Sequence, residues 1–151
     1  MTGAAAAALL LFGRSGRASP AMHFPVNHSP QQWRAMLGAK SYEVLREAAT
    51  EPPFSSPLLK EHRRGTFLCD GCANPLFNSA TKFESGTGWP SFWQVLPHAV
   101  VKRPDHSLMM ERTEVLCARC GGHLGHVFND GPKPTGLRYC MNGLALKFRP
   151  A

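Results

Sequence analysis

The sequence has no run of eighteen apolar residues, so no segment of it is predicted to span a membrane. It also lacks internal repeats and long linkers, and its 151 residues therefore fit a single domain with a single core. Acidic residues are scarce, at 10 against 17 lysines and arginines, which leaves a net charge of +7. This excess is basic, but it is not dense enough to predict a dedicated nucleic-acid-binding protein.

The first 24 residues have no acidic side chain, and "AAAAALLLFGRSGRASPA" places a short apolar run before two arginines. This pattern is typical of a shortened export signal that is cleaved near Ala18 or Ala21. An organelle transit peptide or a disordered tail fits the same composition, because the charges of an export signal normally precede its apolar run. We expect a flexible segment over residues 1–24 and one domain over residues 25–151, located in the cytoplasm or the periplasm, with an organelle as the weaker alternative.

Two short helices are predicted at the start of the domain. Ser29 is placed to cap the first helix, with Pro30 at its first position and Gln32 completing a capping box. This helix is expected to end at Gly38, and a second is expected to run from near Ser41 to the prolines of "TEPPF". The apolar residues expected on one face are Trp33, Met36 and Leu37 in the first helix and Tyr42, Leu45 and Ala49 in the second.

After residue 54 the helical period does not return, and short β segments follow one another, broken by glycine, proline and asparagine. These segments are "TFLC", "PLFN", "SFWQVL", "AVVKR", "SLMMERTEVLC", "GHVF" and "LRYCMNGLALKF". They predict a mainly β fold, an antiparallel sheet or small barrel, with the two helices as an N-terminal flap.

Four of the five cysteines form two C-x-x-C pairs, Cys69 with Cys72 and Cys117 with Cys120, and 44 residues separate the pairs. Each pair follows a predicted strand and lies among small residues. Two such knuckles that face each other supply the tetrahedral four-sulfur site that zinc prefers. We therefore expect one structural Zn²⁺, which joins distant strands and contributes to folding.

Two alternatives use the same cysteines. Two C-x-x-C disulfides would close strained loops, more typical of redox catalysis, and would leave the strands untied. A site made of Cys117, Cys120, His123 and His126 would crowd four ligands into ten residues. Zinc fingers place about a dozen residues between their cysteine and histidine pairs, so the four-cysteine site is the preferred interpretation.

The fifth cysteine, Cys140 in "RYCMN", has no cysteine near it in the sequence. A buried free cysteine is more often inert filling than a nucleophile. Residues two apart on a strand share a face, so Arg138 and Asn142 are expected to point the same way as Cys140. A guanidinium beside a sulfur favours the thiolate, and an amide can hold a polar substrate oxygen. Gly143 follows at once and is expected to mark a bulge, which resets the alternation so that the later residues pack on the core independently.

Two further stretches are more particular than a plain core requires. "GGHLGHVFNDGPKPTG" places His123 and His126 directly after a cysteine knuckle, where an imidazole could transfer a proton or could simply be a hydrogen-bonded core histidine. "SGTGWPSF" surrounds Trp89 with glycine and proline, as in a tight loop that forms one wall of a pocket. Core packing is the usual fate of tryptophan, and we expect it for Trp33 and Trp93.

The stretches "SGTGWPSF" and "HLGHVFNDGPKPTGLRYCMN", with the two C-x-x-C pairs, resemble the methionine-R-sulfoxide reductases of the B type over residues 29–150. The resemblance implies a small zinc-stabilised fold of two antiparallel sheets, of the β-tent type, with short N-terminal helices and the zinc away from the active site. It also implies a monomer without an organic cofactor. The implied substrate is the R epimer of methionine sulfoxide, mainly as a residue in protein, with thioredoxin or another thiol as reductant and no nucleic-acid or membrane partner.

Transferred by position, the resemblance makes Cys140 the attacking cysteine and Arg138 its activating partner. Asn142 would position the substrate and a nearby histidine. His123 and His126 match the paired histidines of the family, with His126 the stronger choice for protonating the sulfoxide oxygen.

The same resemblance assigns the binding pocket. Trp89 matches the indole that receives the methyl group of the substrate, and Phe128 and Asp130 are expected to line the site.

The sequence departs from the family at two positions. Many members carry a second cysteine at the position of Thr87, which forms a disulfide with the first; its absence here predicts that an external thiol attacks the oxidised Cys140. Members commonly carry serine at the position of Gly143, and loss of this hydroxyl is expected to loosen the site only modestly.

A zinc-stabilised binding module without catalysis is the alternative function. It would explain the four cysteines and the basic charge, and "KEHRRG" at residues 60–65 could contact phosphates, although a solvated loop is the simpler reading of that run. It leaves Cys140, Trp89 and the two histidines without a role.

Overall fold

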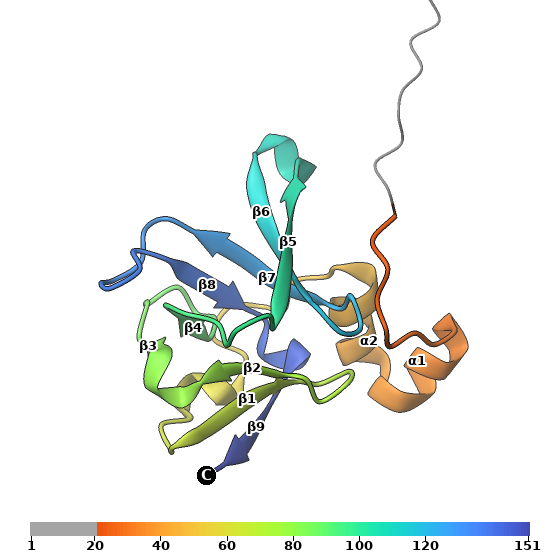
Figure 1. The fold of residues 1–151 in the computed structure, drawn as a ribbon, viewed down its shortest axis with the longest axis horizontal. Coiled ribbons are helices and arrows are strands. Elements are labelled where there is room, and N and C mark those ends of the chain that lie inside the picture. The colour runs from red at the N-terminus through yellow and green to blue at the C-terminus, as the bar shows by residue number, and fades with distance from the viewer. Residues whose placement is uncertain (1–20) are drawn as a thin grey trace, which may run out of the picture.

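The computed structural model describes residues 21–151 (Figure 1). The expected leader lies almost entirely in residues 1–20, outside the described residues. Among the described helices none is long and apolar enough to cross a membrane. From Val26 the chain is tied to the domain, since its amide donates a hydrogen bond to the Arg119 carbonyl at 2.8 Å.

Two helices open the domain, α1 (Pro30–Leu37) and α2 (Ala39–Glu47). The expected capping box is confirmed, because the Gln32 amide donates to the Ser29 hydroxyl at 3.2 Å and the Ser29 amide donates to the Gln32 side chain at 2.9 Å. Gly38, at a φ of 75°, ends α1 as expected and also caps α2. The second helix therefore begins two residues before Ser41.

The rest of the chain forms two antiparallel sheets, as the resemblance implied. The first sheet has the order β2-β1-β9 and the second the order β3-β4-β8-β7-β6-β5. The strands are β1 (Gly65–Cys69), β2 (Pro75–Asn78), β3 (Lys82–Phe83), β4 (Ser91–Phe92), β5 (Val100–Asp105), β6 (Arg112–Cys117), β7 (His123–Phe128), β8 (Arg138–Met141) and β9 (Leu146–Pro150). Short 3₁₀ turns connect them: η1 (Pro57–Lys60), η2 (Ser79–Thr81), η3 (Ser107–Met109) and η4 (Gly143–Ala145).

The predicted strand "LRYCMNGLALKF" is two strands in two sheets. Its first half is β8 and its second half is β9. At Gly143, where the sequence predicted a bulge, the strand has already ended and η4 begins. Two other segments are shorter than predicted: "SFWQVL" contributes only Ser91–Phe92, and "SLMMERTEVLC" enters the sheet only at Arg112. Strand β3 was missed because two residues are too few to show a pattern.

Aromatic side chains from both sheets pack in the core between them. The rings of Phe77 on β2 and Phe92 on β4 stack with centroids 4.2 Å apart, and Phe67 on β1 meets Phe92 edge to face at 4.9 Å. All three side chains are fully buried, and each such burial contributes roughly 1.5–3 kcal/mol. This contact holds the two sheets face to face.

The helices cover one end of the sheets (Figure 1), where α2 contacts β7 and η4. Trp33 is 2% exposed, which confirms its place in the core. The prediction for Met36 is wrong, because this residue is 55% exposed on the open side of α1. Trp93 is only half-buried, since β4 ends at Phe92 and the chain then leaves the sheet.

Candidate functional site

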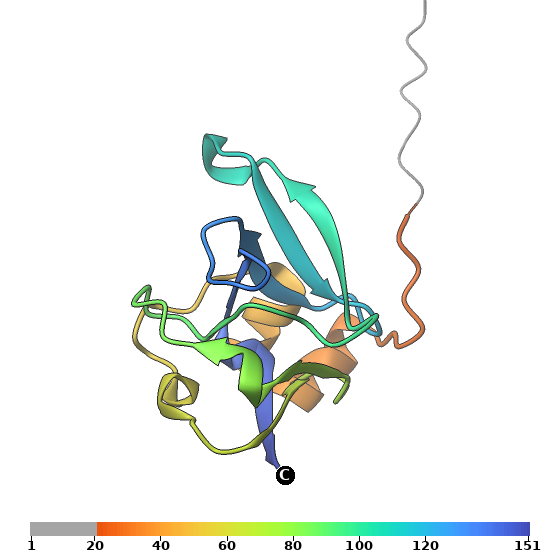
Figure 2. The ribbon, with the colours of Figure 1, turned by 60° about the vertical axis from the view of Figure 1, so that its left-hand side comes forward.

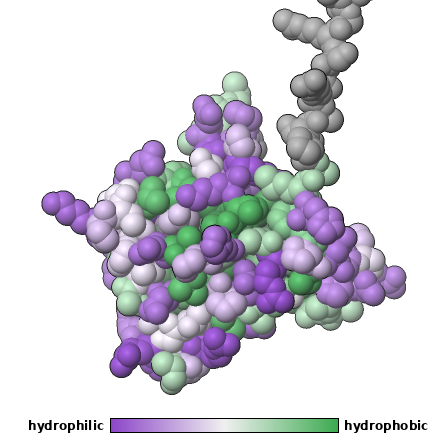
Figure 3. Space-filling model, viewed as in Figure 1, coloured by the Kyte–Doolittle hydropathy of each residue, from purple (hydrophilic) through white to green (hydrophobic). Residues whose placement is uncertain are grey.

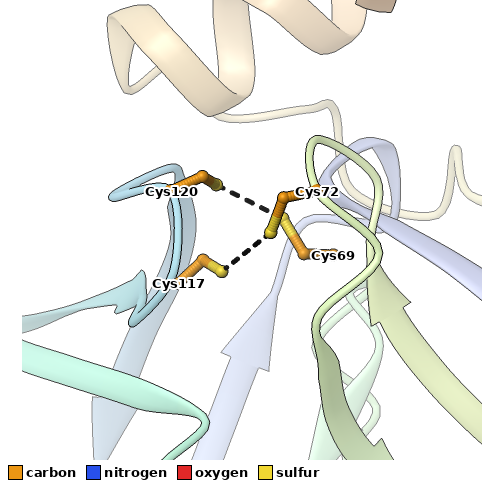
Figure 4. A group of neighbouring side chains, drawn as sticks. All are labelled: Cys69, Cys72, Cys117 and Cys120. Atoms are coloured by element: carbon orange, nitrogen blue, oxygen red, sulfur yellow. Dashed lines mark hydrogen bonds between the residues drawn. The ribbon is translucent and has the colours of Figure 1, made fainter. Parts of the chain in front are cut away.

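Four cysteines from the two sheets converge in one buried cluster (Figure 4). The sulfurs of Cys69 and Cys120 are 3.7 Å apart, those of Cys72 and Cys117 are 3.5 Å apart, and all four lie within 4.8 Å of one another. A tetrahedral metal with metal–sulfur bonds of about 2.3 Å separates its sulfurs by about 3.8 Å, so the four residues fit such an ion. All are free thiols, and neither disulfide of the alternative interpretation is present.

The loops of the two C-x-x-C pairs have the same backbone hydrogen bond and a residue with positive φ at the corresponding position. The amide of Ala73 donates to the Cys69 carbonyl at 2.9 Å, and the amide of Gly121 donates to the Cys117 carbonyl at 2.8 Å. Both Ala73 and Gly121 have positive φ, 60° and 69°, which turns each loop tightly around its sulfurs. The side-chain amide of Asn74 donates to the Cys117 sulfur at 3.6 Å. Such donors stabilise thiolates.

The helical flap closes the cluster. Arg46 on α2 donates to the Cys120 carbonyl at 2.9 Å, and its guanidinium stacks on the Trp33 ring at 4.7 Å. The cluster is therefore buried under the helices. The alternative metal site fails, because His123 is hydrogen-bonded to Glu114 and is not among the clustered ligands.

A second site surrounds Cys140, in a cavity of about 270 Å³. Its lining residues are Thr50, Thr87, Trp89, Arg112, Gly125, His126, Phe128, Arg138, Cys140, Met141 and Asn142. Six of the residues singled out from the sequence are among them, whereas His123 and Asp130 are not. A larger hollow of about 620 Å³ lies beside α2 and η4, but no cysteine or histidine lines it.

Strand pairing brings the nucleophile candidate to the histidines. Cys140 on β8 pairs with His126 on β7 and with Ser91 on β4. Gly125 makes the approach of β7 possible, because a Cβ there would overlap the Cys140 carbonyl. Position 125, between the two histidines of "HLGH", therefore has no room for a side chain.

Burial raises the pKa of the Cys140 thiol, while the nearby Arg138 charge and the Thr87 side chain lower it. Arg138 lowers the pKa of Cys140, as expected, but burial raises it by more. The neutral thiol is therefore the resting form. Arg138 is held by two bonds to Asp130, of 2.9 and 3.0 Å, and lies 4.4 Å from the centroid of the Phe128 ring. Asp130 thus touches the cavity only through Arg138.

His126 is buried and bonded to a carboxylate. Its Nε2 is 2.7 Å from Asp105 Oδ2, and Arg112 also donates to this oxygen at 3.2 Å. Burial lowers the pKa of His126, and the bond to Asp105 only partly opposes this. The pKa of Asp105 is itself lowered, first by the Ser107 amide and then by His126. The ionised Asp105 accepts a hydrogen bond from the Nε2–H group of His126, so Nδ1 is the nitrogen that remains free to take up a proton.

His123 lies beside His126, with ring centroids 5.5 Å apart, but is buried behind the cavity wall. Its Nδ1 is 2.7 Å from Glu114 Oε1. Burial of Glu114 opposes its ionisation, yet the hydrogen bonds from His123 and Arg103 lower its pKa to about 2. The His123 Nε2 is buried without a partner.

Glu51 connects the other walls of the cavity, and sequence reasoning missed it. Its carbonyl accepts from the Trp89 indole at 3.0 Å, and its amide donates to the Asn142 side chain at 3.0 Å. Its carboxylate accepts from the amides of Gly143 and Leu144 at the start of η4. Burial raises the pKa of Glu51. In the sequence, Glu51 is only an acidic residue inside "TEPPF", a stretch whose prolines predicted the end of the second helix, so nothing marked it as part of the site.

The structure explains glycine at position 143. A Cβ on Gly143 would overlap Oγ and Cβ of Ser56, and Glu51 Oε1 would lie 3.3 Å away. Ser56 fills the space because its hydroxyl accepts from the Leu58 amide at 3.1 Å, capping η1. The departure from the family pattern is therefore required by the packing of this chain.

Comparisons with known proteins agree with this geometry. A cysteine beside a histidine is the nucleophile–base arrangement of thiol-dependent enzymes. A family model described as SelR domain matches residues 37–150. The peptide methionine sulfoxide reductase MsrB of Leptospira interrogans is 53% identical over 129 residues, which covers 85% of this chain and 98% of the relative. That of Bradyrhizobium diazoefficiens is 58% identical over 123 residues, 81% of this chain and 88% of the relative.

The chain belongs to the SelR family, whose curated relatives include these MsrB proteins. This confirms the resemblance that the sequence motifs suggested.

The close packing of Ser56 against Gly143 predicts that a side chain at position 143 lowers the stability of the protein. Gly143→Ser should destabilise the protein by about 1–3 kcal/mol, because the added Cβ forces Ser56 and its backbone to move. Ser56→Gly in the same chain should recover part of this loss, as measured by urea denaturation in a double-mutant cycle. Ser55→Gly is the matched control and should recover none. Equal stability of Gly143→Ser and the wild type would contradict the packing argument.

Proposed function

We propose that this protein reduces methionine-R-sulfoxide, preferentially in proteins, to methionine, with Cys140 as the nucleophile. The observation that carries the proposal is the pairing of Cys140 with His126 in a cavity that Trp89 and Arg138 also line. The names of the relatives support the same reaction. The catalytic domain in this proposal is a monomer that spans residues 25–151.

The cavity offers a separate wall to each group on the chiral sulfur. The methyl group would pack on the Trp89 indole, whose ring is fixed by its bond to Glu51. The oxygen would face His126, and the sulfur would face Cys140. The S epimer exchanges two of these groups, so it could not present its sulfur and its oxygen correctly at once.

Cys140 and His126 share one proton in the proposed reaction. The thiol gives its proton to His126, and this transfer creates the thiolate and the acid together. The thiolate attacks the sulfoxide sulfur while the proton passes to the oxygen. The attack forms a bond between the two sulfurs and leaves a hydroxyl group on the substrate sulfur. That hydroxyl then moves to the Cys140 sulfur as the S–O bond of the substrate and the S–S bond both break, so methionine leaves and Cys140 becomes a sulfenic acid.

Arg138 stabilises the thiolate in this scheme, and Asn142 and Phe128 complete the pocket. Asp130 fixes Arg138, and His123 supports His126 from behind. The ionised Asp105 and Glu114 hold the two imidazoles in place.

An external thiol regenerates Cys140 in the proposal. The other four cysteines of the chain are in the metal cluster, so no second thiol adjoins the sulfenic acid. Thioredoxin or a smaller thiol would form a mixed disulfide with Cys140, and a second thiol would release it.

The first test uses the separated R and S epimers of a protected methionine sulfoxide, with dithiothreitol as reductant. The wild type should consume only R, and Cys140→Ser should lose at least about 1,000-fold in rate, because no other group can accept the oxygen. Turnover is followed by chromatography of the product. If the reduced, metal-loaded wild type consumes neither epimer, the binding module without catalysis replaces this proposal.

The second test measures the Cys140 pKa through the pH dependence of its alkylation by iodoacetamide. Because burial raises this pKa, the rate should rise with pH through a midpoint above 9.0, the ordinary value for cysteine. Arg138→Gln removes a charge that favours the thiolate and should move the midpoint higher. Arg149→Gln, on the exposed end of β9, is the matched control and should leave it unchanged. A midpoint that falls in Arg138→Gln would contradict the role given to Arg138.

The metal in the cluster is zinc in this proposal, held by Cys69, Cys72, Cys117 and Cys120 in a structural role. Elemental analysis should find one zinc per chain. Its removal by a chelator should lower Tm by about 10 °C or more, because a loss of several kcal/mol moves a domain of this size by that amount. Wild-type thermal stability in fully metal-free protein would refute a structural role.

A further inference from the structure

The β5–β6 hairpin projects from the body of the molecule (Figures 1 and 2) and carries exposed apolar side chains at its end. Leu108, Met109 and Met110 are 74%, 103% and 57% exposed. In the space-filling view a pale-green group forms the top of the projection, and hydrophilic groups lie directly beside and below it (Figure 3). A fold gains nothing from three large apolar residues held in water.

The tip is a fixed turn. Leu108 and Met109 both have left-handed backbone, with φ of 57° and 54°, which disfavours non-glycine residues. The Ser107 amide donates to Asp105 at 2.9 Å, and Arg112 donates to the Ser107 hydroxyl at 3.3 Å. Strained backbone at an exposed site points to a use outside the fold.

A fully exposed methionine is a target for oxidation. Hydrogen peroxide transfers one oxygen to the thioether and leaves water, which gives methionine sulfoxide as a mixture of R and S epimers. The product at Met109 belongs to the substrate class proposed for this protein. The hairpin end that carries it projects from the body of the molecule (Figures 1 and 2).

Cys140 of the same chain is out of reach of the tip. Cys140, His126 and Glu114 lie in one row across β8, β7 and β6. Met110 is four residues beyond Glu114, about 13 Å along the chain. Two strand-to-strand spacings, about 10 Å, separate β6 from β8, with β7 between them. The tip therefore lies about 16 Å from the Cys140 backbone, which is more than a methionine side chain spans.

We propose that Met109 is an oxidation site that a second copy of this protein repairs. The sulfoxide of Met109 enters the Cys140 cavity of the other copy, which takes the oxygen as a sulfenic acid and is restored by two thiols, with release of water. The inference rests on the proposed function and adds the protein itself to its substrates.

The experiment separates substrate from enzyme. Cys140→Ser protein is treated with hydrogen peroxide, freed of peroxide, and mixed with a catalytic amount of untreated wild type and dithiothreitol. Peptide mass spectrometry follows the sulfoxides of Met109 and Met36, because Met36 is also exposed but lies on α1. Protected methionine-R-sulfoxide is assayed in parallel with the same enzyme.

About half of the Met109 sulfoxide, the R epimer, should disappear several-fold faster than any loss at Met36. Met109→Leu in the enzyme should leave turnover of the protected substrate unchanged. Persistence of Met109 sulfoxide while the protected substrate is consumed would overturn this inference alone, and so would equal rates at the two methionines. Failure of the protected substrate as well would overturn the proposed function with it.

Discussion

The structure depends on one closed circuit between its two sheets. Four cysteine sulfurs lie together at the end of β1 in one sheet and the end of β6 in the other, where a metal ion would join the two strands. The circuit closes through hydrogen-bonded neighbours: β6 pairs with β7, β7 with β8, and β9, which follows β8 through η4, pairs with β1. Cys140 lies on β8, directly before the chain crosses between the sheets. A metal in the cluster therefore fixes the strand that carries the thiol without touching the cavity.

Burial shifts the pKa values of the two central groups of the cavity in opposite directions. It raises the pKa of Cys140 and lowers the pKa of His126, so both groups rest in their neutral forms. The fixed charges lie one step further out: Asp105 holds His126, and Asp130 holds Arg138. A reaction that needs a thiolate and an acid together then starts from a single proton on the thiol. In the proposed reaction, the neutral Cys140 thiol is therefore the form from which the proton is transferred.

Much of the fold and the site followed from local patterns. The capping box at Ser29, the stop at Gly38 and the two C-x-x-C pairs each act within a few residues, so the sequence was sufficient to place them. Strand lengths were less predictable, because pairing partners decide where a strand ends: "SFWQVL" has the composition of a six-residue strand, but only Ser91 and Phe92 find a neighbour. Met36 has helical spacing with Trp33, yet no element packs over it.

The sequence by itself determined which groups are available. They are four cysteines in two C-x-x-C pairs, a fifth cysteine separate from them, the two histidines of "HLGH", and a tryptophan in a glycine- and proline-rich stretch. Only the tertiary structure decided their environments. Glu51 joins Trp89 to Asn142, Ser56 excludes a side chain at Gly143, and His123 is turned away to Glu114. These contacts join residues that are distant in the chain, and whether a side chain is desolvated, bonded or crowded depends on neighbours that no local pattern names.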